Sequence, residues 1–328
     1  PVDSQQMIAG TCGDIARTVT VTCATDGNHG RSVAWGARLF GCRCVIYVHE
    51  SVSEARCAAI AQYGADVIRV PGNYDDSVRH AADEARKNGW TVVSDTTYEG
   101  YREIPIDVMH GYGVMAREIV RALADERAGP SQARIAPSRK EGAQRQGCIN
   151  DPPTHVFVQA GVGALAASVC AAFWLAWEAR RPELVIVEPT HADCCFQSGK
   201  AGRPVAVTGN LDTVMAGLAC GEVSPLAWEI VDAGASAYVA VDDRFALDAM
   251  RTLASPAPGD PAVVAGETGA SGLAALLAAK GRDDIWRTLR LGAQSRVLLI
   301  GSEGDTDPEI YRQIVGSAAA AAASVGVL

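Results

Sequence analysis

The sequence predicts an α/β fold built from two doubly wound lobes, each with a mainly parallel sheet. Short apolar, β-branched runs alternate with segments of helical period, which is the pattern of βαβ units. Two glycine-rich turns follow such runs, one in each half of the chain. A chain of 328 residues is long enough for two lobes of ordinary size, each with its own core.

The first, smaller lobe is predicted to span residues 1–127. Its strands are expected at Thr18–Ala24, Cys44–His49, Asp66–Val70 and Trp90–Asp95. Its helices are expected at His29–Phe40, after a capping-box pattern formed by Ser51 and Glu54, and at Asp75–Asn88 before Gly89. A longer helical stretch, Ile106–Arg127, closes the lobe.

Residues 128–151 are polar and basic, contain Pro and Gly, and show no apolar period, so a mobile surface loop or linker is predicted there. The second, larger lobe is predicted to span residues 152–328. Its strands are expected at Thr154–Gln159, Leu184–Val187 and Arg296–Ile300, with helices after Gly163, Gly272 and Pro308 and an alanine-rich helical tail. The ligand site of two such lobes is expected in the cleft at the carboxyl ends of their strands.

Composition narrows the classes of partner. A net charge of −9 argues against nucleic-acid binding, and the absence of an apolar run of membrane-spanning length argues against membrane insertion. The ten cysteines are scattered and no secretory leader opens the chain, so we expect a cytoplasmic protein without disulfide framework or metal. Two close cysteine pairs are interpreted as buried thiols rather than metal ligands: Cys42 with Cys44, and Cys194 with Cys195. The expected partner is a small molecule.

Both glycine turns suit an anion, because small residues let backbone N–H groups approach a ligand at a helix N-terminus. In the second turn, Gly161, Gly163 and Ala166 also satisfy a dinucleotide-binding pattern, with Glu188 near the place of the ribose-binding acid. A tight turn without ligand is a further alternative. In the first turn, Asp26 fits a simple helix N-cap as well as a functional carboxylate.

Seven segments occur in one order, namely "TDGNHG", "SDTTYEGY", "QAGVGALA", "IVEPTHADC", "MAGLACGE", "AGETGASGL" and "GSEGDTD". Together they resemble the diaminopropionate ammonia-lyases, a family of fold-type-II pyridoxal-phosphate enzymes. The likeness runs from Val19 to Val315 and is interrupted at residues 128–151. The resemblance implies pyridoxal 5'-phosphate between the lobes, a homodimer, and α,β-elimination of 2,3-diaminopropionate to pyruvate and ammonia.

The resemblance also implies roles for single residues. Asp26 and Asp95 would be catalytic carboxylates that face the substrate, Asn28 would lie beside the pyridine hydroxyl, and Ser302 would bond the pyridine nitrogen. The cofactor phosphate would be held by Gly161, Val162, Gly163, Ala164 and Leu165. A carboxylate suits this chemistry, because the cofactor acidifies the substrate Cα–H and the departing amine must be protonated.

Four further residues have two interpretations each. Glu267 and Glu303 either frame the pyridine edge or serve as loop caps, and Cys194 and Cys220 either meet near the cleft or remain separate thiols.

The sequence departs from this family at one point. The family holds its cofactor through a lysine well before the Gly-Asn turn, but no lysine precedes Asp26. The chain has four lysines at ordinary surface places, of which Lys200 is the one expected in a turn of the second lobe: Lys87, Lys140, Lys200 and Lys280. We expect a preceding segment to supply the lysine and part of the second sheet.

Three other functions stay open at this stage. They are a serine or threonine dehydratase, a catalytically inactive ligand-binding homologue and, more distantly, a nicotinamide-dependent dehydrogenase.

Overall fold

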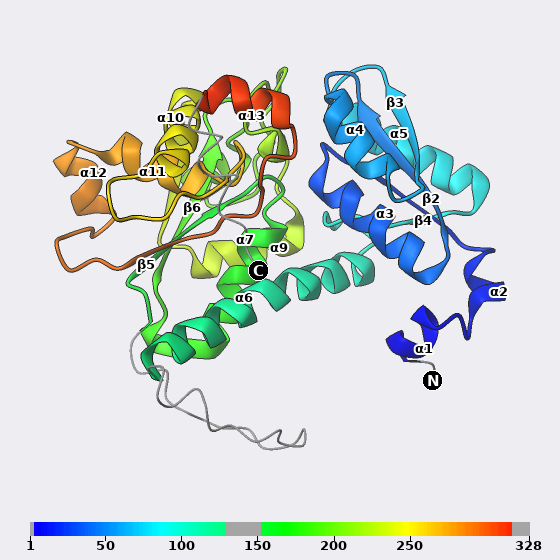
Figure 1. The fold of residues 1–328 in the computed structure, drawn as a ribbon, viewed down its shortest axis with the longest axis horizontal. Coiled ribbons are helices and arrows are strands. Elements are labelled where there is room, and N and C mark those ends of the chain that lie inside the picture. Colours follow the sequence, from blue (N-terminus) through cyan, green and yellow to red (C-terminus); the bar gives the residue numbers. More distant parts are fainter. Residues whose placement is uncertain (1–2, 129–151, 317–328) are drawn as a thin grey trace.

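The computed structural model describes residues 3–128 and 152–316. The predicted loop at 128–151, which contains Lys140, and the predicted alanine-rich tail lie almost wholly outside these residues. The described chain forms two four-stranded parallel sheets, which confirms the predicted α/β class. Figure 1 shows the two sheets side by side, each with its own helices. Within the described ranges, no helix combines the length and apolar character needed to cross a membrane.

The first sheet has the strand order β3-β2-β1-β4. Its strands are β1 (Thr20–Ala24), β2 (Arg43–His49), β3 (Asp66–Val70) and the short β4 (Thr91–Val92). Its helices are α3 (Asn28–Phe40), α4 (Glu54–Ala61) and α5 (Tyr74–Asn88), and two short helices precede β1: α1 (Ser4–Ile8) and α2 (Gly13–Ala16).

The predicted helix ends in this lobe are confirmed in one case and wrong in another. Helix α5 ends as predicted, because Gly89 adopts the left-handed conformation with φ 69°. The cap of α4 is Ser53, whose side chain accepts from the backbone N of Arg56 at 3.3 Å. The capping box predicted from Ser51 and Glu54 is therefore wrong, because the chain turns two residues later and leaves Ser51 free to bond His49.

Helix α6 (Glu103–Ala128) runs between the two sheets. In Figure 1 it passes below both bodies, and Met109 and Ala116 are buried in the core that surrounds the second sheet. The helix thus packs onto the core of the second sheet, although it follows the first sheet in sequence.

The second sheet has the order β7-β6-β5-β8. Its strands are β5 (His155–Gln159), β6 (Glu183–Pro189), β7 (Ala237–Val241) and β8 (Val297–Leu299). Strand β7 was not predicted, although all five of its residues, AYVAV, are apolar. The helices are α7 (Ala164–Trp177), α8 (Cys194–Ala201), α9 (Pro225–Gly234), α10 (Asp243–Ala254), α11 (Ser271–Ala279), α12 (Asp283–Thr288) and α13 (Pro308–Val315), with single turns at η1 (Glu178–Arg180) and η2 (Ala216–Leu218).

The strand orders explain where the site lies. In each sheet the order reverses beside one strand, between β1 and β4 in the first and between β5 and β8 in the second. Ligands of doubly wound sheets bind at such switch points, outside the carboxyl ends of the strands. The segments that follow β1, β4, β5 and β8 contain Asp26, Asp95, Gly161 and Ser302, so four predicted site residues come from these four ends.

Candidate active site

A cavity of about 710 Å³ lies between the two sheets. Every residue predicted for the site lines it: Asp26, Asn28, Asp95, Gly161, Val162, Gly163, Ala164, Leu165 and Ser302. Tyr74 of α5 and Tyr112 of α6 complete the wall on the side of the first sheet. The folded chain therefore brings together residues that are far apart in sequence.

The second glycine turn forms the N-terminal end of α7 at the cavity wall. Gly163 is the N-cap residue and adopts a left-handed conformation with φ 90°, which favours glycine. A Cβ on Gly161 would lie 3.0 Å from Cys220 Sγ and 3.1 Å from the Gly217 carbonyl oxygen, so this position also has little room for a side chain. The arrangement presents a helix N-terminus to the cavity, where an anion is stabilised.

A second group of polar atoms lies at the carboxyl ends of β5 and β8. The Gln159 Nε2 donates a hydrogen bond to Ser302 Oγ, and both residues line the cavity. The Gln159 Oε1 is buried and has no hydrogen-bond partner among the described residues. Because a buried amide oxygen is costly to leave unpaired, this end of the cavity suits a ligand with polar ring atoms.

Asn28 is held by a buried charge cluster at the junction of the two sheets. Its Nδ2 donates to Glu303 Oε1 at 3.2 Å, and the same oxygen lies 3.0 Å from Arg56 Nη1. The second Arg56 nitrogen lies 3.6 Å from Glu267 Oε2, and the Thr268 backbone N donates to Glu303 Oε2 at 3.1 Å. Arg56 of α4 thereby connects the first sheet to two loops of the second.

Within this cluster the two glutamates, Glu267 and Glu303, support Asn28 from behind the cavity wall. Neither Glu267 nor Glu303 lines the cavity, so they lie behind Asn28 rather than beside the ligand. Burial raises the pKa of Glu267, the neighbouring Glu303 raises it further, and Arg56 opposes both. Arg56 was not predicted as a site residue, because nothing in the local pattern of α4 marks an arginine as buried.

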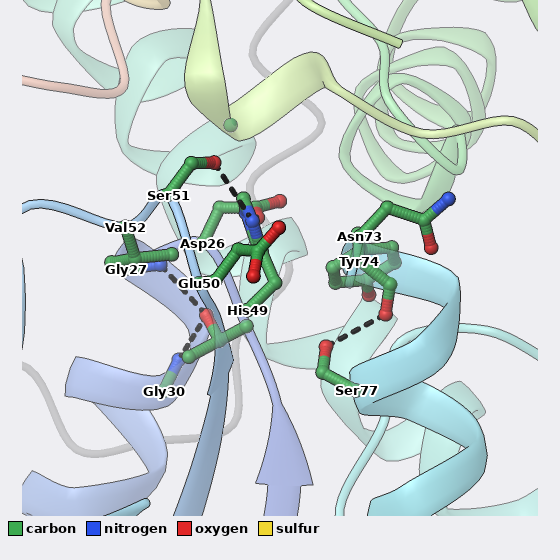
Figure 2. A network of polar contacts seen from close by, with 12 residues as sticks. Asp26, Gly27, Gly30, His49, Glu50, Ser51, Val52, Asn73, Tyr74 and Ser77 are labelled. Carbon is green, nitrogen blue, oxygen red and sulfur yellow. Dashed lines mark hydrogen bonds and ion pairs between the residues drawn. The ribbon is translucent and has the colours of Figure 1, made fainter. Parts of the chain in front are cut away.

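Asp26 lies at the end of β1 and is buried, with 7% of its surface exposed. Its Oδ1 is 2.6 Å from His49 Nε2, at the end of the neighbouring strand β2 (Figure 2). Burial raises the pKa of Asp26, and the hydrogen bond and charge of His49, together with the charge of Arg56, oppose this rise. His49 was not predicted as a site residue.

The N-cap alternative for Asp26 is wrong. The N-cap position of α3 is Gly27, and the turn is closed by Thr25, whose Oγ1 accepts from the backbone N of Gly27 and of Gly30 at 3.0 Å each. The carboxylate of Asp26 therefore has no capping duty at this helix, and it lines the cavity.

Asp95 follows β4 and lines the cavity together with Asp26. Tyr112 lines the cavity beside Asp95, and burial together with the charge of this carboxylate raises the pKa of Tyr112.

The dinucleotide interpretation is not supported by the position of Glu188. This residue is fully buried, and its carboxylate accepts from the backbone N of Cys195 at 2.8 Å and of Phe196 at 2.7 Å, at the start of α8. Burial raises the pKa of Glu188 to about 8. The side chain thus caps α8 and does not line the cavity.

The thiols near this helix are close to one another. Ligand atoms of Glu188, Cys194 and Cys195 lie within 4.8 Å of one another, but both carboxylate oxygens already accept backbone hydrogen bonds. Cys194 and Cys220 both border Gly161 and are free thiols, so they lie near the cavity as predicted without forming a disulfide.

None of the described lysines lines the cavity. Lys200 lies on α8 and is exposed, so its predicted place in a turn is wrong. Lys87 pairs with Glu84 on the surface of α5, and Lys280 is exposed after α11.

Comparison with known proteins defines the class to which this site belongs. Residues 7–291 match the family described as pyridoxal-phosphate dependent enzyme. The chain belongs to this family, and the fold and the two switch-point turns agree with it.

The relatives narrow the assignment further. Diaminopropionate ammonia-lyase of Escherichia coli K12 is 39% identical over 304 residues, which are 92% of this chain and 71% of the relative. A crystal structure of the E. coli enzyme in complex with D-serine has a TM-score of 0.78 at 37% identity and covers 91% of this chain and 70% of its own. A second, with an aminoacrylate-PLP azomethine reaction intermediate, has a TM-score of 0.78 at 36% identity, covering 96% and 78%. Within the pyridoxal-phosphate enzymes, the chain therefore belongs to the diaminopropionate ammonia-lyase family.

Proposed function

We propose that this chain forms the catalytic body of an ammonia-lyase that converts 2,3-diaminopropionate to pyruvate and ammonia by α,β-elimination. One observation supports this reaction best: two carboxylates, Asp26 and Asp95, face the same cavity as the anion-binding turn of α7. Two carboxylates match a substrate that carries two ammonium groups. The names of the relatives point to the same substrate.

The residues of the cavity fit pyridoxal 5'-phosphate. The turn from Gly161 to Leu165 would hold its phosphate at the N-terminus of α7. Ser302 would bond the pyridine nitrogen, and Asn28 would lie at the ring hydroxyl. The buried Gln159 Oε1 has no hydrogen-bond partner among the described residues and is available to accept a hydrogen bond at this end of the cavity. When bound, the cofactor withdraws electrons from the substrate Cα and so acidifies its proton. None of the lysines in the described part of the chain lines the cavity, so none of these would attach the cofactor.

The two carboxylates would divide the proton transfers. Asp26 has one oxygen bound to His49, which leaves Oδ2 to accept the α-proton of the substrate. Asp95, which lines the same cavity, would bind the substrate ammonium group or deliver the proton that the departing amine requires.

Relative rates test this reaction against a dehydratase. Purified complete gene product should turn over 2,3-diaminopropionate with a kcat/KM well above that for serine or threonine. Preference for serine or threonine, whose leaving group is a hydroxyl, would refute the assignment. Visible absorbance of bound cofactor that changes on borohydride reduction separates both enzymes from an inactive homologue, which would show no such band.

We further propose that the protein is a cytoplasmic homodimer with a lobe boundary at residue 127. The exposed Leu175 at the end of α7, with 83% of its surface accessible, is one apolar side chain that such an interface would bury. Light scattering coupled to gel filtration measures the mass, and a monomer at micromolar concentration would contradict the dimer.

A further inference from the structure

Three side chains form a continuous hydrogen-bonded chain from the cavity to the surface. Asp26 Oδ1 lies 2.6 Å from His49 Nε2, and the Nδ1 of the same ring lies 3.0 Å from Ser51 Oγ. Figure 2 shows Ser51, His49 and Asp26 in this order at the ends of β1 and β2. Asp26 is buried, the side chain of His49 is 15% exposed, and Ser51 is exposed.

The local structure explains why the histidine holds this position. His49 is the last residue of β2, and β2 pairs in parallel with β1, so its side chain is delivered to the edge where Asp26 follows β1. The Ser51 hydroxyl engages Nδ1 from the turn before α4, which fixes the orientation of the ring and leaves Nε2 for the carboxylate.

Other charged or titratable groups also face Asp26, and they come from separate elements. Arg56 of α4 lowers its pKa, whereas Asp75 of α5 raises it. The partly buried Tyr74 of α5 and the buried Cys220, after η2, lie near the same carboxylate. The imidazole of His49 is the group in direct hydrogen bond with Asp26.

We infer that His49 is a positioning residue for the reaction, which orients the Asp26 carboxylate through its hydrogen bond to Oδ1 and so leaves Oδ2 directed to accept the substrate α-proton. This inference depends on the proposed role of Asp26. In the proton transfer the substrate Cα–H bond breaks, its electron pair stays with the substrate, and the proton binds to Oδ2. His49 itself does not line the cavity.

Two substitutions separate the hydrogen bond from the charge. His49→Gln places a neutral N–H donor near the position of Nε2, whereas His49→Leu removes donor and charge together. His80→Gln is the matched control, because His80 is exposed on α5 and contacts Tyr47 outside the cavity. All variants are made in the complete gene product and checked by circular dichroism for a native spectrum.

Kinetics should separate the variants clearly. On the substrate enantiomer whose elimination requires Asp26, His49→Gln should lower kcat by about tenfold with little change in KM, and His49→Leu by about 100-fold, since hydrogen bonds to charged groups are worth this much. In both variants the acid limb of kcat/KM should move to higher pH, because Asp26 loses the partner that favours its ionised form. His80→Gln should keep the wild-type profile.

A second readout needs no activity. The carboxyl carbon of Asp26, labelled with ¹³C and assigned with Asp26→Asn, should titrate at higher pH in both His49 variants than in the wild type, in protein freed of cofactor. An unchanged titration of Asp26 in His49→Gln, or an unmoved acid limb, would overturn the inference even if His49→Leu fails to fold. Full activity of Asp26→Asn on both enantiomers would instead refute the proposed role of Asp26, while the NMR titration would still report the contact.

Discussion

Arg56→Met tests the charge cluster that joins the two sheets. The guanidinium of Arg56 is 7% exposed, and it lies 3.0 Å from Glu303, which is fully buried as a side chain, and 3.6 Å from Glu267. Methionine fills much of the same space but has no charge. The variant therefore leaves two buried carboxylates without their cation.

The expected loss of stability is large. Removing one partner of a buried ion pair costs about 3–5 kcal/mol, because the remaining charge is left uncompensated. For a protein of this size that loss lowers the midpoint of thermal unfolding by roughly 6–20 °C. The matched exposed substitution, Arg86→Met, removes an ion pair with Asp83 on the surface of α5 and should leave the midpoint close to that of the wild type.

The loss of unfolding free energy in Arg56→Met should be greater at neutral pH than at acidic pH. Burial holds the pKa of Glu267 above its usual value, and Arg56 opposes this, so the variant raises that pKa further. A carboxyl with a raised pKa in the folded protein destabilises the fold as pH rises above the unfolded value of about 4.5. The difference in unfolding free energy between wild type and Arg56→Met should therefore be greatest near neutral pH and shrink as pH falls toward 5.

Urea unfolding of the cofactor-free protein at pH 5 and pH 7.5 measures these differences. Adding Glu303→Gln to Arg56→Met should recover part of the loss, because one of the stranded carboxylates is removed. A variant as stable as the wild type at both pH values, or no recovery in the double variant, would show that the cluster does not hold the sheets together.

Three further outcomes are expected. Asp26→Asn should keep the cofactor absorbance, and its rate of elimination should fall by about 10²–10⁴-fold for at least one enantiomer of 2,3-diaminopropionate. Retained activity on both enantiomers would exclude Asp26 as a base. Gly161→Val should weaken cofactor binding by at least about tenfold in equilibrium titration, because its Cβ would lie 3.0 Å from Cys220 Sγ; unaltered affinity would exclude this turn as the phosphate site. Glu188→Gln should gain thermal stability relative to wild type as pH rises from 5 to 9. Burial raises the pKa of Glu188 to about 8, so ionisation of the wild-type carboxyl at higher pH destabilises the folded state. A stability difference that is constant with pH would contradict this.

Local patterns in the sequence were sufficient for most elements of the fold. The alternation of apolar runs with helical periods located β1, β2, β3, β5 and β6 to within about two residues. Glycine and capping signals located the end of α5 at Gly89 and the start of α7 after Gly163, because these residues act through their own backbone conformation. Strand β7 was missed although its residues are all apolar, and the cap of α4 was placed at Ser51 because two nearby serines fit a capping pattern.

Some residues of the candidate site were likewise predictable from local sequence, and others were not. The glycine turns and the two aspartates were found because each lies in a motif of a few adjacent residues. His49, Arg56 and the supporting place of Glu303 were not, since each gains its function from a partner elsewhere: His49 bonds Asp26 across 23 residues, and Asn28 bonds Glu303 across 275.

The sequence by itself thus determined which turns could bind an anion and which carboxylates could move a proton. The tertiary structure decided which groups hold those carboxylates in place and in which charge state, since parallel pairing of β1 with β2 sets His49 against Asp26 and contact between the lobes sets Arg56 against Glu303. The physical reason is that hydrogen bonds and desolvation depend on distance in space, which a residue's neighbours in the chain do not fix.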